Sequence, residues 1–206
     1  MLLSADKKFL FVHIQKTGGS SIGTVLRERV PDVRHFLGTH DFAVKAWDAL
    51  GDGWGSYFSA AFVRNPWERM VSWYEMIRQQ GKKNAEGLSS LKFWHYVLER
   101  ASTFEEFLYE CTDTIEDRDG CKSILFNQID YIADSSGAVM VDFVGRFERL
   151  EQDAQGLFER LGLGQVSLPQ VNRSDHGSYR VYYSEETRGL VEERFARDIA
   201  YFGYEF

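Results

Sequence analysis

The chain has 206 residues, of which 44% are hydrophobic and 15% aromatic, so it is long enough to bury a substantial core as a single domain covering residues 1–206. Its net charge of −7 argues against general binding to nucleic acid or to anionic membranes. Any anionic ligand must therefore be held by local positive groups.

Two sequence features predict the cellular compartment of the protein. Lys7 and Lys8 lead directly into the first apolar segment, which is not the pattern of a signal peptide, and no apolar stretch approaches the roughly 18 residues of a spanning helix. Cys111 and Cys121 are too few for a disulfide framework and lack partners at metal-ligand spacing. One bridge between them is possible, but we expect two reduced thiols in a cytoplasmic protein without a membrane span or a required metal.

Hydrophobic periodicity predicts strands that alternate with helices along the chain. The expected elements, in chain order, are a strand at 8–14, helices at 20–30 and 41–50, a strand at 57–63, helices at 66–80, 88–100 and 103–111, a strand at 139–144, and helices at 149–161 and from about 184 onward. This order predicts an α/β fold, P-loop-like and three-layered, with a mainly parallel central sheet flanked by helices. Ligands of such sheets bind at the carboxyl ends of the strands.

Local signals place several helix ends. Asn65 is expected as an N-cap with Pro66 at the first helical position, and Gly81 is expected just beyond the end of that helix. Thr103 and Glu106 form a predicted capping box.

The segment after the first strand carries the strongest chemical signal. Lys16, Thr17, Gly18, Gly19, Ser20 and Ser21 stand between the strand and the next helix. The N-terminus of a helix attracts anions through its free N–H groups and its dipole, glycines allow close approach, and a lysine adds charge. A plain glycine turn is the alternative, but the density of lysine, glycine and hydroxyl groups favours a phosphate-type ligand.

The order of these residues differs from that of the nucleoside-triphosphate loop G-x-x-x-x-G-K-[ST]. Lys16 precedes the glycines, and no glycine stands five residues before it. An ATPase or GTPase is therefore disfavoured, although a phosphotransferase with an atypical loop stays open.

A second signal follows the strand at 57–63. Arg64 leaves the strand end, and Ser72 lies about two turns into the next helix. The arginine fork suits bidentate phosphate binding, and a serine hydroxyl can add one bond. The alternative is that Arg64 pairs with a carboxylate while Ser72 faces solvent.

Together the two segments resemble the sulfotransferases that use 3′-phosphoadenosine 5′-phosphosulfate (PAPS). The first is similar to their 5′-phosphosulfate loop, and the second to their 3′-phosphate motif R-[ND]-P-x-x-R-x-x-S-x-[YW]. The residues from His13 to Gly19 are most similar to the heparan sulfate 6-O-sulfotransferases, within the carbohydrate sulfotransferase group. The chain is shorter than the eukaryotic Golgi enzymes and lacks their N-terminal anchor, which suggests a compact, bacterial-type member. Weaker similarities to the same family occur at residues 127–132, 144–148 and 172–180.

The resemblance implies transfer of a sulfuryl group from PAPS to an acceptor hydroxyl by in-line displacement, with PAP as product. It implies a hydroxyl-bearing acceptor, a glycan or another small molecule. The net charge argues against nucleic acid as a partner, and the oligomeric state stays open. By similarity to the motifs of that family, the residues expected to bind the cofactor are Lys16, Thr17, Gly18, Gly19, Ser20, Ser21, Arg64, Ser72, Ser174 and Arg180. Lys16 also stabilises charge on the leaving phosphate.

The resemblance also implies a histidine base between the two motifs. Gly38-Thr39-His40-Asp41-Phe42 is similar to that segment, so His40 is the first candidate. His13 is the second and His35 can compete with both, whereas His40 could instead be an ordinary loop residue before a helix capped by Asp41. A protein that binds the nucleotide without catalysis is a further alternative.

Overall fold

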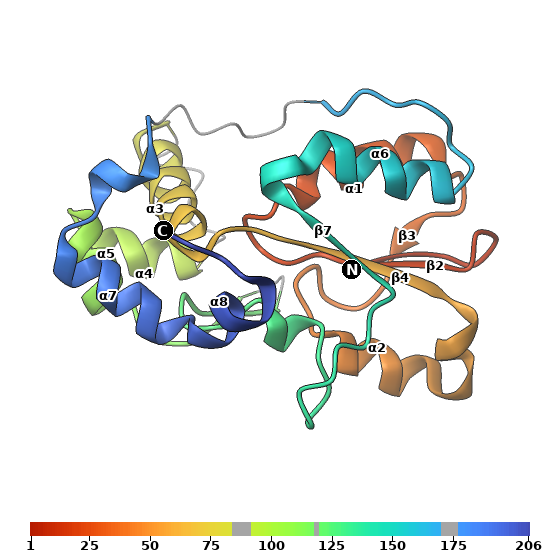
Figure 1. The fold of residues 1–206 in the computed structure, drawn as a ribbon, viewed down its shortest axis with the longest axis horizontal. Helices are drawn as coiled ribbons and strands as arrows, with labels where there is room; N and C mark the ends of the chain where they lie inside the picture. Colours follow the sequence, from red (N-terminus) through yellow and green to blue (C-terminus); the bar gives the residue numbers. More distant parts are fainter. Residues whose placement is uncertain (84–91, 118–119, 170–176) are drawn as a thin grey trace. The chain divides into compact units, whose positions relative to one another are not determined.

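The computed structural model describes residues 1–83, 92–117, 120–169 and 177–206 (Figure 1). Contacts between residues divide the chain into two units. The first contains Met1–Arg64 and Gln128–Asn172, and the second contains Asn65–Asn127 and Arg173–Phe206. Ser174 lies outside the described residues.

A five-stranded sheet in the order β3-β1-β2-β4-β7 organises the first unit. Its strands are β1 Leu2–Ser4, β2 Phe9–Val12, β3 Arg34–His35, β4 Phe58–Val63 and β7 Phe143–Arg146. β2 and β4 run parallel, as do β4 and β7, but β1 is antiparallel to both β2 and β3. The sheet is therefore mixed, and the expectation of a mainly parallel sheet is wrong. A short turn joins β1 to β2, and such a connection permits only antiparallel pairing.

Helices cover both faces of this sheet, as expected for a three-layer α/β arrangement. Figure 1 shows α1 (Gly19–Arg29) and α6 (Leu150–Arg160) on one face and α2 (Ala43–Leu50) on the other. Side chains alternate along a strand, so Phe9 and Phe11 join the core beneath α1 and α6, while Leu10 and Val12 are buried on the opposite side. α2 ends where predicted, because Gly51 takes a positive φ of 52° and a 3-10 helix Gly51–Ser56 follows.

The third predicted strand forms later in the chain than periodicity indicated. β7 begins at Phe143, whereas Val139 makes only an isolated bridge with Ala133. The carboxylate of Asp142 accepts hydrogen bonds from the backbone N–H and the hydroxyl of Ser59, at 2.8 and 2.9 Å. The Asp142 N–H also donates to the Ser59 carbonyl at 3.0 Å, so the chain lies beside β4 from this residue onward.

The second unit is mainly helical. It contains α3 Pro66–Lys83, α4 Lys92–Arg100, α5 Phe104–Glu110, α7 Glu185–Arg194 and α8 Ala196–Phe202, with a hairpin of β5 Ile115–Asp117 and β6 Gly120–Lys122. α3 packs against α4, α5 and α7. Its predicted apolar face is buried, through Trp67, Met70, Val71, Tyr74 and Ile77.

The predicted caps of this unit are confirmed with one exception. The Asn65 side-chain oxygen accepts from the N–H groups of Trp67 and Glu68, and Thr103 and Glu106 form their capping box. α3 does not stop before Gly81. A Cβ at this position would stand 2.9 Å from the Leu98 methyls of α4, so the glycine permits close helix packing and does not end the helix.

The final helix is divided in two at Phe195, between α7 and α8. Cys111 and Cys121 are both free thiols. None of the helices in the described ranges is long and apolar enough to cross a membrane.

The packing of β7 against β4 predicts a stability effect at Gly145. A Cβ there would lie 2.3 Å from the ring of Phe62, whose side chain is fully buried. We expect Gly145→Ala to lower the free energy of unfolding by about 1–3 kcal/mol, because a packed core resists added volume. The measurement is the urea unfolding midpoint.

Gly156→Ala is the matched control. Gly156 is exposed within α6, and a Cβ there meets nothing within 4 Å. Alanine should raise the unfolding free energy by about 0.5–1 kcal/mol, since glycine loses more entropy in a helix. Equal effects of the two substitutions would contradict the packing account.

Candidate functional site

The loop between β2 and α1 is shaped by residues with left-handed backbone. Lys16 has a φ of 69° and Gly18 a φ of 83°. The Thr17 hydroxyl donates to the Ile14 carbonyl at 2.9 Å and fixes the turn from within. A lysine in this region is uncommon and carries strain. The loop is thus a specific structure and not a generic connection.

The N-terminus of α1 is open to an anion. Its N-cap is Gly18, which has no side chain to cap this end. The first amides of a helix have no partner within the helix, and the dipole is positive there. No acidic residue stands in the first turn. A phosphate or sulfate group would find backbone donors at this end.

Two glycines of the loop are required by close neighbours. A Cβ at Gly19 would stand 2.2 Å from the His13 ring, and a Cβ at Gly18 would stand 2.8 Å from Leu150. The same Cβ at Gly18 would stand 3.2 Å from the Phe147 ring. These glycines therefore allow His13 and α6 to pack directly against the loop backbone.

Arg64 joins the same site from the end of β4. Its guanidinium donates to the Lys16 carbonyl at 3.2 Å and lies over the Phe147 ring, 3.8 Å from the centroid. The side chain is 5% exposed. The Gln128 amide holds the backbone of Arg64 at both ends, accepting from its N–H and donating to its carbonyl, each at 2.8 Å. The structure thus brings the two sequence motifs together at Arg64.

The charge of Lys16 responds to this environment. Burial and, after it, the nearby positive charge of Arg64 together lower the pKa of Lys16 from 10.5 to about 7. An anion bound here would favour the protonated lysine.

His13 and His40 form a contacting pair beside the loop. Their ring centroids are 4.6 Å apart with an interplanar angle of 61°, and His40 Nδ1 lies 2.9 Å from the His13 carbonyl oxygen. Burial, followed by the charge of His40, holds the pKa of His13 well below its usual range. His13 is therefore neutral near neutral pH.

Asp41 holds the loop that carries His40. Its carboxylate accepts from the Gly38 N–H at 2.7 Å and from Lys45 at 2.8 Å. α2 has Phe42 as its N-cap, without a side-chain bond, so Asp41 does not cap this helix. Its role is to close the Gly38–Asp41 turn.

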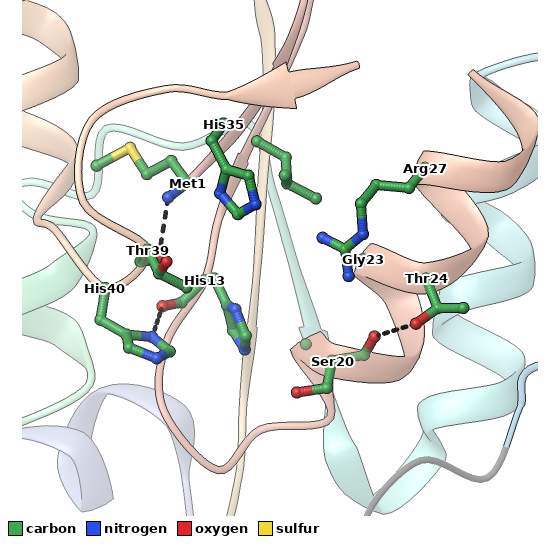
Figure 2. A pocket seen from close by; sticks show the side chains of 11 residues that line it. Met1, His13, Ser20, Gly23, Thr24, Arg27, His35, Thr39 and His40 are labelled. Atoms are coloured by element: carbon green, nitrogen blue, oxygen red, sulfur yellow. Dashed lines mark hydrogen bonds between the residues drawn. The ribbon is translucent and has the colours of Figure 1, made fainter. Parts of the chain in front are cut away.

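A cavity of about 420 Å³ opens beside these histidines (Figure 2). His13, Gly19 and Ser20 form one part of its wall, and His40 and Thr39 another. Arg27 and His35 also line it. The cavity therefore adjoins both the start of α1 and the candidate base.

The structure does not place the remaining predicted residues on the wall of this cavity. Ser21 is buried in α1. Ser72 belongs to the second unit, where it is 3% exposed in α3 and does not face solvent. Arg180, also in the second unit, donates to the Phe206 carbonyl at 2.8 Å. His95 is exposed on α4. Among the described residues, no three His, Cys, Asp or Glu side chains are grouped to hold a metal.

Comparison with known proteins identifies the family. A sequence profile described as the sulfotransferase family matches residues 1–205. The chain belongs to the sulfotransferase family. Membership supports a P-loop-like fold and an enzyme that transfers a sulfuryl group. A search among curated proteins found no match.

Several residues that shape this candidate site were not identified from the sequence as site residues. Gln128 and Phe147 position Arg64, and the Tyr131 hydroxyl donates to the Gln15 side chain at 2.7 Å, next to Lys16. Gln128 and Tyr131 lie in the segment 127–132, and Phe147 in 144–148. Both segments resemble the family in sequence, but their contacts with Arg64 and Gln15 can be recognised only in the folded structure.

If PAP is the ligand of this loop, as the resemblance implies, the lowered pKa of Lys16 predicts proton uptake on binding. Above pH 7 the free lysine is largely neutral, and a bound phosphate raises its pKa, so binding should take up close to one proton at pH 8. Phosphate itself is fully ionised there, since its second pKa is about 6. The affinity should fall with rising pH above 7, approaching about tenfold per unit.

Calorimetry at pH 8 in two buffers of different ionisation enthalpy measures this uptake. Lys16→Met should abolish it. Uptake near zero in the unmodified protein would mean that the ligand does not contact Lys16.

Proposed function

We propose that this chain transfers a sulfuryl group from PAPS to a hydroxyl, on a carbohydrate acceptor, with His40 as the base. The observation that carries the proposal is the hydrogen bond from His40 to the His13 carbonyl, beside the open N-terminus of α1. Family membership supports the sulfuryl transfer. The donor, the acceptor class and the base are our inference.

The N-terminal end of α1 fits the anionic end of the donor. Backbone N–H groups of Gly19 and Ser20 and the ammonium of Lys16 are the donors that a phosphosulfate requires. We assign Thr17, Gly18 and Ser21 to the same cradle, since they shape and begin the helix. Arg64, held by Gln128, adds a planar cation on the next strand.

His40 has the tautomer that a base needs. A carbonyl oxygen can only accept, so Nδ1 of His40 carries the proton in its bond to His13. In the neutral ring the lone pair is then on Nε2. His40 lines the cavity, where an acceptor hydroxyl can reach it. His13, neutral and packed against Gly19, fits a supporting role better than that of base.

The reaction then follows from these residues. Nε2 of His40 takes the proton of the acceptor hydroxyl as its oxygen bonds to sulfur. Lys16 and the first amides of α1 stabilise the charge that develops on the phosphate oxygen when its bond to sulfur breaks. The products are the sulfated acceptor and PAP. Preorganised donors and a positioned base each contribute factors of about 10²–10⁴ in rate.

The other assignments rest on sequence resemblance alone. They comprise a 3′-phosphate contact at Ser72, nucleotide contacts at Ser174 and Arg180, and the action of residues 1–206 as one catalytic domain. The carbohydrate acceptor rests on the similarity of residues 13–19 to glycan sulfotransferases.

The donor assignment predicts micromolar binding of PAP, measured by calorimetry. Lys16→Met should weaken binding at least tenfold, because it removes the only cation of the loop. Arg64→Lys should also weaken it, since a lysine keeps the charge but loses the planar fork. The matched control is Arg29→Gln, at an exposed position near the end of α1, and it should leave PAP binding unchanged.

Each failure points to a different function. Absence of PAP binding would reject the proposal, and magnesium-dependent ATP turnover would then favour a phosphotransferase. PAP binding without transfer to any acceptor in a broad hydroxyl panel would indicate a non-catalytic nucleotide-binding protein.

The base assignment predicts that His40→Ala binds PAP normally but loses transfer by about 10²-fold or more. Transfer is measured with radiolabelled sulfate from PAPS across a panel of sugars and other hydroxyl compounds. His95→Ala, on the exposed side of α4, is the control. Unchanged turnover in His40→Ala would move the base to His13 or His35.

A further inference from the structure

One turn of 3-10 helix in the first unit contacts both phosphate-motif segments of the candidate site. The turn, Ile129–Tyr131, begins after Gln128. The Gln128 amide at its start holds the backbone of Arg64 through two hydrogen bonds of 2.8 Å. The Tyr131 hydroxyl at its end donates to the Gln15 side chain at 2.7 Å, and Gln15 directly precedes the loop lysine. Both segments are therefore held from the same turn.

The ring of Tyr131 reaches a third part of the site. It stacks on Phe42, with the ring centroids 4.6 Å apart and an interplanar angle of 19°. Phe42 is the N-cap of α2 and directly follows the Gly38–Asp41 turn, which carries His40. Stacking of two aromatic rings is an attractive contact with a defined geometry. One side chain thus contacts the residue before the lysine through its hydroxyl and the residue after the His40 turn through its ring.

The surroundings of Tyr131 hold it in one position. Its side chain is fully buried. The Met140 N–H donates to the Ile132 carbonyl at 2.8 Å, and Ala133 forms a bridge with Val139, so the chain folds back directly behind the turn. A side chain that is locked by packing on an ordered backbone can keep its neighbours in one geometry.

We infer that Tyr131 is a positioning residue that fixes the phosphate loop and the base relative to each other. Its hydroxyl orients Gln15 and hence the backbone of Lys16, and its ring orients Phe42 and hence the turn of His40. This inference rests on the proposed function, because it takes Lys16 as a contact of the donor and His40 as the base. Such alignment matters for in-line transfer, since a displacement of about 1 Å can lower the rate by about 10²-fold.

The hydroxyl of Tyr131 can be tested apart from its ring. Tyr131→Phe removes the bond to Gln15 and keeps the stack on Phe42. The Lys16 backbone has a strained φ of 69°, so its conformation depends on its neighbours. Calorimetry should show PAP binding weakened by about threefold to tenfold, the effect expected of one neutral hydrogen bond.

The ring contact is tested by Phe42→Leu, which removes the stack and keeps an apolar residue at a half-buried position. The Tyr131 hydroxyl still reaches Gln15 in this variant, so PAP binding should stay unchanged. The turn that carries His40 loses its support, and kcat for transfer of radiolabelled sulfate from PAPS to the most active hydroxyl compound of the panel should fall by about tenfold or more.

Two further variants separate positioning from a loss of stability. In a Gln15→Met background, Tyr131→Phe should not weaken PAP binding any further, because both changes remove the same hydrogen bond. Tyr96→Phe on α4 is the matched control, since the Tyr96 hydroxyl donates to the Glu110 carbonyl at 3.1 Å and accepts from the Asp113 N–H at 3.0 Å. It should lower the urea unfolding midpoint and leave PAP binding and transfer unchanged.

Three results would overturn the inference and leave the proposed function standing. They are PAP binding by Tyr131→Phe as tight as that of the unmodified protein, full additivity of its effect with that of Gln15→Met, and full transfer by Phe42→Leu. Absence of PAP binding by the unmodified protein, or of its transfer to any acceptor, would instead reject the proposed function and this inference with it.

Discussion

The parallel pairing of β2 with β4 is the constraint on which the site depends. Val12 pairs with Ala61, so both strands run toward the same edge of the sheet and their following segments meet there. This register brings the Lys16 loop and Arg64 into contact, although 48 positions separate them. His13 leaves β2 at the same edge and accepts the hydrogen bond of His40. A shift of β4 by one residue would turn its side chains to the other face of the sheet and break this alignment.

Lys16 and Arg64 place positive charge in a buried part of the protein, and two of the groups that contact Arg64 are neutral. The Lys16 carbonyl and the Phe147 ring receive the Arg64 guanidinium, and Gln128 fixes its backbone. Because its pKa is lowered to about 7, Lys16 is partly deprotonated near neutral pH. The proposed anionic ligand would bring a counter-charge to these two cations. A local pair of cations therefore reconciles the proposed anionic ligand with the net negative charge of the chain.

The sequence predicted the parts of the fold that local rules control. Caps at Asn65 and Thr103, the helix face from Trp67 to Ile77 and the strand before Lys16 follow from capping and periodicity. Two-residue and three-residue strands such as β3 and β1 carry too little pattern to be recognised, and their antiparallel pairing made the sheet mixed. Gly81 was misjudged because a glycine that ends a helix and one that admits a neighbour look alike in sequence. The contacts of Gln128 with Arg64 depend on a fold that joins residues 64 positions apart.

The left-handed backbone of Lys16 gives this position two opposing demands. A lysine at a φ of 69° costs about 1 kcal/mol or more relative to a glycine, which adopts this conformation freely. A glycine would therefore make the empty protein more stable, and would also remove the cation from the loop. Selection for thermal stability alone would therefore favour replacement of Lys16 by glycine. A stabilised variant of this enzyme should be selected with its ligand present, so that the lysine is retained.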